Sequence, residues 1–333
     1  MLNPKLKLNP KIFSADVEQV PIRKGFGQGL LAAGEADKNV VGLCADLTES
    51  TQMHLFAEKF PERFVQVGVA EQNLVTVASG MAAMGKIPFV SSYAMFSPGR
   101  NWEQIRTTIA YNDVPVKIVG SHGGISVGAD GGTHQALEDL TLMRALPNMD
   151  VISPCDALEA KKATLAIAKT GKPAYLRLLR EKTPVMTTEE TPFALGREEI
   201  FWMPEIGVAD VGIIATGGLL YRALLAAREL EAEGIKTKVM NLATIKPLDA
   251  GSVVTLAKEC KAIVTVEEHQ TMGGAGSAVA EVLAENFPVP IEFIGVKDRF
   301  GQSGTPEELI EEYEMGKNSI KEAVKKVLKR RIP

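Results

Sequence analysis

The hydrophobic positions of this chain fall into short apolar runs that alternate with longer segments of helical periodicity. In the first half, the apolar runs predict strands at residues 40–44, 64–67, 88–92, 114–120, 150–153 and 174–179. Helical segments lie between most of them, at residues 24–35, 52–60, 72–84, 102–111, 137–146 and 157–169. Strands that are apolar on both faces and alternate with helices indicate a mostly parallel, doubly wound α/β sheet.

The pattern breaks at residues 181–207, where Pro184, Pro192 and Pro204 predict a linker or an extended crossover. Strands are predicted again at residues 211–216, 236–241, 263–267 and 291–295, and helices at 219–233, 252–260, 276–286 and 320–331. A capping box at residues 305–308 begins one further helix. We therefore expect an irregular arm at 1–20, a first domain at 21–185, a linker at 186–207 and a smaller, mostly parallel second domain at 208–333.

Composition narrows the class of protein. With 333 residues, 45% hydrophobic and 23% charged, and a net charge of −4, the chain is typical of soluble globular proteins without general affinity for nucleic acid or anionic membranes. Cys44, Cys155 and Cys260 lie far apart in or beside apolar runs, which predicts buried free thiols and a cytoplasmic protein. The apolar segments are too short for a secretion signal or a membrane span, and we expect neither.

The stretch FVQVGVAEQN at residues 64–73 predicts a strand that stops at Gly68 and a helix that begins near Glu71. The helix is apolar nearly all round, so we expect it in the interior. An acidic residue at such a helix start is more often solvated and favoured by the helix dipole. Alternatively, burial favours its protonated form opposite a ligand nitrogen. The stretch alone leaves both interpretations open.

Ligands of parallel sheets bind at the carboxyl ends of the strands. The predicted strands place Asp46, Glu71, Tyr93, Phe96 and His122 at that edge. The two aromatic residues are core residues by default, and a stacking role requires a planar ligand beside them.

The loop at residues 121–135 holds His122, Asp130, His134 and five glycines directly after a predicted strand. Glycines allow the backbone to approach a ligand closely, but a flexible loop with hydrogen-bonded histidines fits the pattern equally well. A metal site is disfavoured because no second cluster supplies further ligands, and a serine hydrolase is disfavoured because no G-x-S-x-G motif occurs. The glycines at 273–276, after His269, predict a tight turn more readily than a phosphate cradle.

Three motifs closely resemble the pyrimidine-binding domain of the transketolase family: GVAEQN at residues 68–73, SSYAMF at 91–96 and VGADGGTHQ at 127–135. The second unit resembles the C-terminal domain of that family, so the resemblance covers roughly residues 20–330. It implies a thiamine diphosphate enzyme that transfers a two-carbon ketol unit between sugar phosphates.

The resemblance also implies roles on the cofactor side. Glu71 matches the glutamate that hydrogen-bonds the aminopyrimidine of thiamine diphosphate and promotes loss of the thiazolium proton. Phe96 matches the aromatic residue that stacks on the pyrimidine, with Tyr93 beside it, and Asp46 matches an acidic residue near the cofactor at the subunit interface. Many relatives have a second aromatic residue soon after the stacking phenylalanine, whereas Ser97-Pro98-Gly99 follows here.

On the substrate side, the resemblance implies a phosphate site whose donors suit a doubly charged anion. The matching residues are Arg23, Ser50, His122 and Arg180, with Arg177 as a near rival of Arg180. Asp130 matches the residue that contacts the hydroxyls of the donor sugar, and His134 the residue near the carbonyl under attack. His134, His122 and Glu71 are thus the expected catalytic residues.

Related families remain as alternatives. 1-Deoxyxylulose-5-phosphate synthase usually has arginine where this chain has His122, and the four phosphate ligands argue against a 2-oxoacid dehydrogenase beta subunit. A non-catalytic chain that regulates a thiamine enzyme is a further alternative, against which the intact Glu71, His122, Asp130 and His134 weigh.

The resemblance further implies that the part of the enzyme that binds the diphosphate is on another chain. The family binds the diphosphate and Mg²⁺ with a Gly-Asp-Gly motif on a preceding domain, and this sequence contains no such motif. We expect a separate N-terminal transketolase subunit to hold both groups, and two chains of each kind to form a heterotetramer. The preferred sugars and the role of the second domain stay open.

Overall fold

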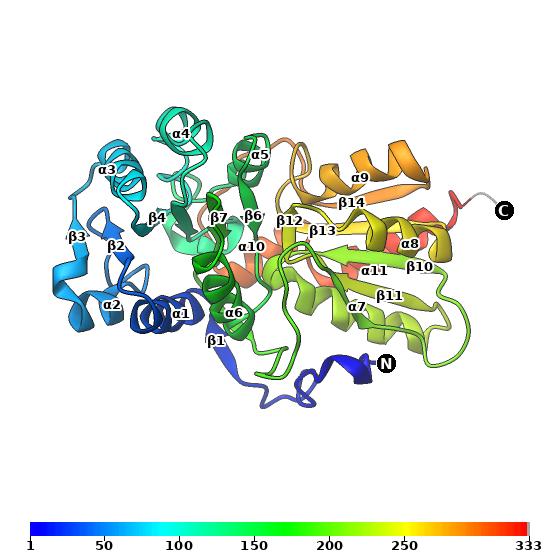
Figure 1. The fold of residues 1–333 in the computed structure, drawn as a ribbon. Coiled ribbons are helices and arrows are strands. Elements are labelled where there is room, and N and C mark those ends of the chain that lie inside the picture. Colours follow the sequence, from blue (N-terminus) through cyan, green and yellow to red (C-terminus); the bar gives the residue numbers. More distant parts are fainter. Residues whose placement is uncertain (332–333) are drawn as a thin grey trace.

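The computed structural model describes residues 1–331; residues 332 and 333 of the predicted second domain lie outside the described part. Two α/β units lie side by side, with the earlier half of the chain on the left of Figure 1 and the later half on the right. Cys44, Cys155 and Cys260 are buried free thiols, as predicted. No helix within residues 1–331 combines the length and apolar character that crossing a membrane requires.

The first unit is built on a seven-stranded sheet with the order β12-β6-β7-β5-β4-β2-β3. The strands are β2 (Val40–Cys44), β3 (Phe64–Gln66), β4 (Ile87–Tyr93), β5 (Lys117–Ser121), β6 (Asp150–Ile152), β7 (Ala174–Arg177) and β12 (Thr244–Lys246). Apart from β12 they pair in parallel, which confirms the predicted sheet. Their carboxyl ends therefore share one edge.

Helices cover both faces of this sheet, because successive residues of each buried strand point to opposite sides. The helices are α1 (Ile22–Ala36), α2 (His54–Lys59), α3 (Glu71–Ala83), α4 (Trp102–Gln104), α5 (Asp139–Arg144) and α6 (Ala157–Ala168). Leu74 of α3 packs with Val41, and Phe26 of α1 packs with Val40 on the other face. The helix expected at residues 102–111 is divided into α4 and a π-helical segment at Ile105–Ala110.

The second unit has a five-stranded sheet with the order β14-β13-β10-β11-β9. Its strands are β9 (Glu199–Trp202), β10 (Val211–Ala215), β11 (Thr237–Asn241), β13 (Ile263–Gln270) and β14 (Ile291–Val296). Helices α8 (Ala250–Cys260) and α9 (Ala275–Asn286) cover one face, and α7 (Leu220–Ala232) and α11 (Lys317–Leu328) the other. Helix α10 (Pro306–Glu312) begins with the predicted capping box at Thr305 and Glu308.

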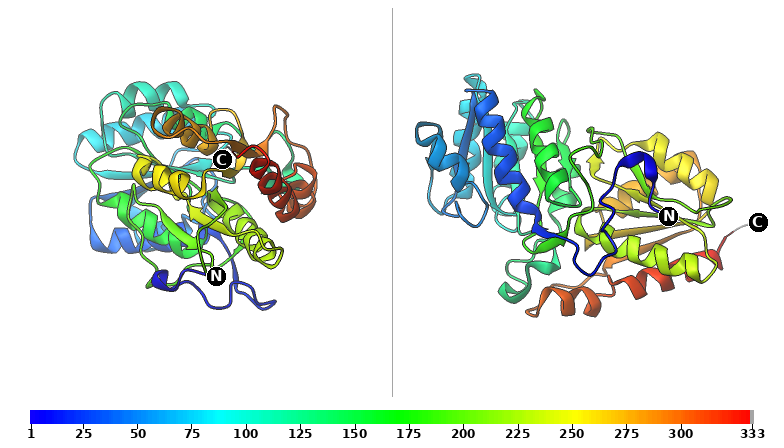
Figure 2. Two further views of the ribbon diagram at one scale, coloured as in Figure 1. Left: turned by 90° about the vertical axis from the view of Figure 1, so that its right-hand side faces the viewer. Right: turned by 90° about the horizontal axis from the view of Figure 1, so that it is seen from below.

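Three short strands depart from the expected division of the chain. β9 lies within the predicted linker and pairs antiparallel with β11. β12 follows β11 in sequence but pairs antiparallel with β6, so the second half of the chain completes the first sheet. β1 (Gln19–Pro21), at the end of the predicted irregular arm, pairs with β8 (Lys182–Pro184). Figure 2 shows this arm running along the underside from the first unit to the second.

Candidate functional site

The predicted site residues gather at the carboxyl edge of the first sheet. Most of them lie at or just after the carboxyl end of a parallel strand, whereas Glu71 begins the helix after β3. Asp46 follows β2, Glu71 begins α3 after β3, Tyr93 ends β4, Phe96 follows it, His122 follows β5 and Arg180 follows β7. Asp46 is exposed at φ +61°, and its backbone N–H donates to Oε1 of Gln66 at 2.7 Å.

Glu71 is 3% exposed, which excludes the solvated interpretation of this acid. Its Oε1 accepts a hydrogen bond from Oγ of Ser92 at 3.1 Å, and its Oε2 accepts one from Nη1 of Arg100 at 3.0 Å. Asn101 Nδ2 donates to the backbone carbonyl of Glu71 at 2.9 Å and so holds the helix start in place. The carboxyl group lies on the wall of a hollow of about 580 Å³, lined by residues 69–73 and Arg100.

Aromatic rings form a wall beyond Arg100, which itself lines the hollow. Tyr93 and Phe96 stack with ring centres 5.9 Å apart and planes inclined by 17°. His122 stacks on Tyr93 at 3.8 Å, and His134 meets the edge of Phe96 at 5.4 Å. The Arg100 guanidinium carbon lies 4.1 Å from the centre of the Phe96 ring. Arg100 therefore bridges Phe96 and Glu71, and a planar ligand that contacts both must displace its half-exposed side chain.

A cationic group lies beside the aromatic wall. Nε of Arg23 donates to the backbone carbonyl of Arg180 at 3.2 Å, and Nη1 donates to the carbonyl of Ser50. Nη1 of Arg180 donates to the carbonyl of Val127 at 3.2 Å and pairs with Glu181 at 2.7 Å. Burial, followed by the nearby charge of Arg180, lowers the pKa of Arg23. Two guanidinium groups held this close together favour an anion between them.

His122 completes this group as a neutral imidazole. Burial, followed by the charges of Arg23 and Arg180, lowers the pKa of His122 from its ordinary value of 6.5 to about 3. Its Nδ1 lies 2.9 Å from Oγ of Ser121. The ring is therefore uncharged at neutral pH.

Protonation of His122 should make the protein less stable in acid. The unfolded chain binds this proton near pH 6.5 and the folded chain only near pH 3, so stability is complete above pH 6.5 and falls as the pH drops below it. The expected loss is up to about 1.4 kcal/mol per pH unit. Urea unfolding between pH 7 and pH 4 should show a shallower loss for His122→Asn. If the free energy of unfolding fell with pH at the same rate in the variant and the parent chain, the lowered pKa of His122 would be contradicted.

The glycine-rich loop has a defined conformation with contacts along its length. Residues Ile125–Asp130 form two short 3-10 turns that meet at a kink at Gly128, and Gly124, Gly128 and Gly131 adopt positive φ values of 86°, 82° and 76°. The backbone N–H of Ser126 donates to Oε1 of Glu268 at 2.5 Å. His134 is half-buried and hydrogen-bonds Oγ1 of Thr133 through Nδ1 at 2.9 Å, whereas Asp130 is exposed.

The structure does not bring Arg177 into the cationic group. Its guanidinium is buried and pairs with Asp139, with Nε 2.8 Å from Oδ2. Nη2 donates to the carbonyls of Ala136 at 3.2 Å and Glu268 at 2.9 Å. Because Arg177 is buried in these contacts whereas the side chain of Arg180 is 35% exposed, Arg180 is the better candidate for an anion ligand.

The second glycine-rich segment is a turn, not a phosphate cradle. The carboxylate of Glu267 accepts the backbone N–H groups of Ala275 at 2.7 Å and Gly276 at 2.9 Å, so it occupies the start of α9 itself. Burial raises the pKa of Glu267 to about 7. His269 is fully buried, and burial lowers its pKa to about 4, which fits a structural histidine.

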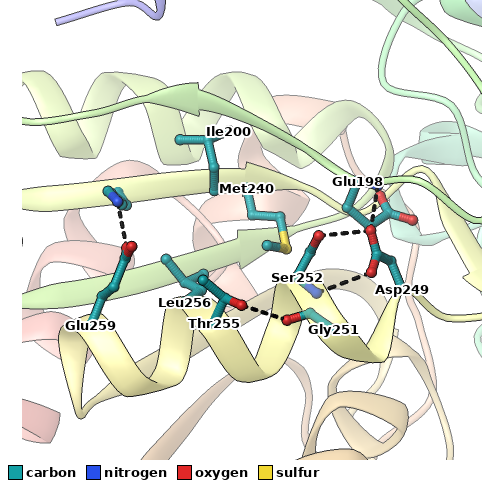
Figure 3. A pocket seen from close by; sticks show the side chains of 10 residues that line it. Glu198, Ile200, Met240, Asp249, Gly251, Ser252, Thr255, Leu256 and Glu259 are labelled. Atoms are coloured by element: carbon teal, nitrogen blue, oxygen red, sulfur yellow. Dashed lines mark hydrogen bonds and ion pairs between the residues drawn. The ribbon is translucent and has the colours of Figure 1, made fainter.

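Another hollow, of about 350 Å³, lies between β9, β11 and α8 in the second unit (Figure 3). Its polar groups satisfy one another: Asp249 accepts from the backbone N–H of Ser252 at 3.0 Å and from its hydroxyl at 2.7 Å, and Lys238 pairs with Glu259. Glu198 accepts the N–H groups of Ala243 and Thr244. This hollow therefore offers little to a ligand.

Sequence reasoning missed Ser92 and Arg100 as neighbours of Glu71. Ser92 precedes Tyr93 in β4, so its side chain points to the opposite face from Tyr93, toward α3. Arg100 lies four residues beyond Phe96, directly after the segment 97–99, in which this sequence departs from the transketolase family pattern. Each of the two residues lies close in the sequence to a predicted site residue, but only the fold shows that both side chains meet the carboxylate of Glu71.

Comparison with known proteins identifies the relatives of this chain. Residues 18–186 match the family described as transketolase, pyrimidine binding domain, and residues 207–320 match transketolase, C-terminal domain. A chain of Methanocaldococcus jannaschii assigned as a transketolase C-terminal section is 42% identical over 312 residues, which cover 93% of this chain and 96% of that one. The 6-deoxy-6-sulfo-D-fructose transketolase subunit of Clostridium sp. (strain MSTE9) is 39% identical and covers 96% of this chain and 98% of that one.

A solved structure is similar over the same length. It is described as a split gene transketolase in an inactive beta4 tetramer, with 42% identity, a TM-score of 0.87 and coverage of 94% of this chain and 100% of that one. The sequence motifs, the paired α/β units and these matches agree with one another. The chain belongs to the transketolase family, of which it contains the pyrimidine-binding and C-terminal domains.

Proposed function

We propose that this chain is the C-terminal subunit of a two-subunit transketolase, which transfers a two-carbon ketol unit between sugar phosphates. The observation that supports this proposal most strongly is the arrangement at one sheet edge. There the buried carboxyl group of Glu71 and the ring of Phe96 lie beside the cationic group, which consists of Arg23, His122 and Arg180. In this proposal residues 21–185 form the pyrimidine-binding domain and residues 208–333 the C-terminal domain.

In this proposal the aminopyrimidine of thiamine diphosphate binds beside Glu71. A planar ring needs a flat apolar wall and a hydrogen-bonding group at its edge: Glu71 lines the hollow, and Phe96, which Arg100 covers, would supply the wall once Arg100 moves. When bound, thiamine diphosphate stores the carbanion that the transfer requires. Glu71 would hold a proton at its carboxyl group toward a ring nitrogen, Tyr93 would support Phe96, and Arg100 would give up its ion pair with Glu71.

The cationic group would bind the phosphate of the sugar. Arg23 and Arg180 supply charge and N–H donors, and neutral His122 supplies one more hydrogen bond, with Ser50 adjacent. Asp130 is exposed on the glycine-rich loop, where it would contact the hydroxyls of the donor sugar. His134, at the edge of Phe96, would lie near the reacting carbonyl and transfer a proton to or from the oxygen of that group.

We infer that a separate N-terminal subunit holds Mg²⁺ and the diphosphate, and that two chains of each kind form a heterotetramer. Relatives that match over nearly their whole length carry names of subunits, including an apulose-4-phosphate transketolase subunit of Phocaeicola vulgatus, 35% identical over 302 residues. The rim of the hollow also carries an exposed apolar side chain: Val69, close to Glu71, is 70% exposed. A partner covering this rim would bury it. The buried free thiols suit a reducing cytoplasm.

Reconstitution tests the proposal directly. Native mass spectrometry and ketol transfer from a phosphorylated ketose to an aldose phosphate would be measured for this chain alone, for the N-terminal subunit alone and for the mixture. We expect turnover only in the mixture, together with a mass of two plus two chains. Strong transfer by the lone chain would refute the two-subunit proposal. Release of CO₂ from pyruvate in place of ketol transfer would assign a synthase-like reaction instead.

A further inference from the structure

The segment at residues 297–304, between β14 and α10, lies against the glycine-rich loop of the first unit; we call this segment the clasp. A Cβ atom on Gly132 would lie 2.7 Å from the carbonyl oxygen of Gly301, and one on Gly131 would lie 2.6 Å from Oγ of Ser303. The two segments therefore touch where neither has room for a further side chain. The second unit thus contacts the loop that carries Asp130 and His134.

Gln135 joins the clasp to this loop. Its side chain is 3% exposed, and Nε2 donates to the carbonyls of Ile125 at 2.9 Å and Gln302 at 3.0 Å. A Cβ atom on Gly301 would lie only 1.7 Å from Oε1 of Gln135. Since Gln135 is held by two hydrogen bonds, it cannot move aside without losing them.

The clasp is itself braced by the second unit. Gln270 accepts from the backbone N–H of Asp298 at 3.1 Å and donates to the carbonyl of Arg299 at 2.9 Å. The hydroxyl of Tyr313 donates to the carbonyl of Phe300 at 2.7 Å, and the guanidinium of Arg299 lies 3.8 Å from the centre of the Tyr313 ring. Such a braced segment can hold a neighbouring loop in one position.

The second unit also contacts the glycine-rich loop through β13 and α10. Glu268, in β13, accepts the backbone N–H of Ser126 at 2.5 Å. Pro306, the first residue of α10, approaches Gly128, where a Cβ atom would lie 3.2 Å from its Cδ. Ser126 and Gly128 of the segment Ile125–Asp130 are thus both in contact with the second unit.

We infer that the clasp is a positioning element for the substrate: through Gly301 and Gln135 it sets the places of Asp130 and His134. His134 precedes Gln135 directly, and Asp130 ends the kinked segment Ile125–Asp130, whose first carbonyl accepts a hydrogen bond from Gln135. Displacement of reacting groups by about 1 Å can cost as much as 10²-fold in rate. The inference rests on the proposed function, and it gives the second unit a part in the reaction without any contact to cofactor or substrate.

Gly301→Ala and Gln135→Met test this in the reconstituted complex. The first displaces the glutamine side chain, and the second keeps its shape but removes both hydrogen bonds. We expect KM for the donor sugar phosphate to rise about tenfold in each because Asp130 is displaced, and kcat to fall because His134 is displaced, while the Kd of thiamine diphosphate stays the same. Gly171→Ala is the matched control, because a Cβ atom there meets nothing within 4 Å among the described residues.

Hydrogen exchange in the isolated chain provides a readout that does not depend on activity. Amides of residues 126–134 should exchange about tenfold faster in both variants, whereas those of the first turns of α3 should not change. This readout holds even if the parent complex shows no ketol transfer, so failure of the proposed function and failure of the inference remain distinguishable.

Two results would overturn the inference. One is unchanged loop exchange and unchanged KM in folded variants, and the other is an equal loss of thiamine diphosphate affinity, which would mark a general structural role. If Gly301→Ala does not fold, the outcome for Gln135→Met decides.

Discussion

Replacing Glu71 with glutamine should lower ketol transfer by the reconstituted enzyme by about 10²-fold or more. Glutamine keeps the shape of the side chain and can still accept the hydrogen bond from Ser92, but it cannot exchange a proton with a ligand nitrogen. Steady-state kinetics at saturating thiamine diphosphate would measure the loss. We expect it in kcat, because the proton transfer belongs to the chemical step.

Folding should survive this substitution. The ion pair that is lost joins Glu71 to an Arg100 side chain that is 50% exposed, and such pairs contribute little to stability. Glu285→Gln, at an exposed position of α9, is the matched control and should behave as the parent chain. Near-normal turnover of Glu71→Gln would remove Glu71 from the proposed chemistry, whatever else the site does.

Replacing Arg180 with alanine should weaken the use of phosphorylated sugars by roughly ten- to a hundredfold. A charge-assisted hydrogen bond to phosphate contributes about 1.5 to 3 kcal/mol, and Arg180 is one of two guanidinium groups in the cationic group. The comparison of kcat/KM for phosphorylated and non-phosphorylated donors measures the effect. Non-phosphorylated donors should suffer little.

Two controls separate binding from folding in this experiment. Arg197→Ala removes an exposed guanidinium group whose ion pair with Glu199 lies outside the site, so neither class of donor should be affected. Arg177→Ala leaves Asp139 buried without its partner and should destabilise the fold instead. If Arg180→Ala weakened both classes of donor equally, this residue would belong with folding or cofactor binding.

The alternation of apolar runs and helical segments was sufficient to predict the parallel strands of the first sheet. Apart from the edge strand β3, which is partly exposed, these strands are buried on both faces, and that burial demands a nearly continuous apolar run, which is visible without any knowledge of the partner strands. The carboxyl edge followed from the same argument, since parallel strands all end on one side. Glu71, Tyr93 and His122 could therefore be placed together before any contact between them was known.

Pairing between distant segments could not be predicted in this way. β9 and β12 are short, and each becomes a strand only because an edge of a sheet lies beside it: β12 pairs with β6, about a hundred residues earlier. Arg177 remained a near rival of Arg180 in the sequence, because both are arginines near the end of one strand. Their roles diverge because Asp139, from a different helix, lies within 2.8 Å of Arg177 alone.

The local order of residues thus determined the two α/β units, the edge that carries the site and most of the side chains found there. Only the tertiary structure decided which charges neutralise one another, and hence that Arg100 covers Phe96 and Glu71 and that Glu267 closes the second glycine-rich turn. It also brought the clasp to the glycine-rich loop, where Gln135 meets Gln302 from 167 positions away in the sequence. The reason is physical: apolar periodicity is a property of neighbouring residues, whereas the partner of a buried polar group is set by the packing of the whole chain.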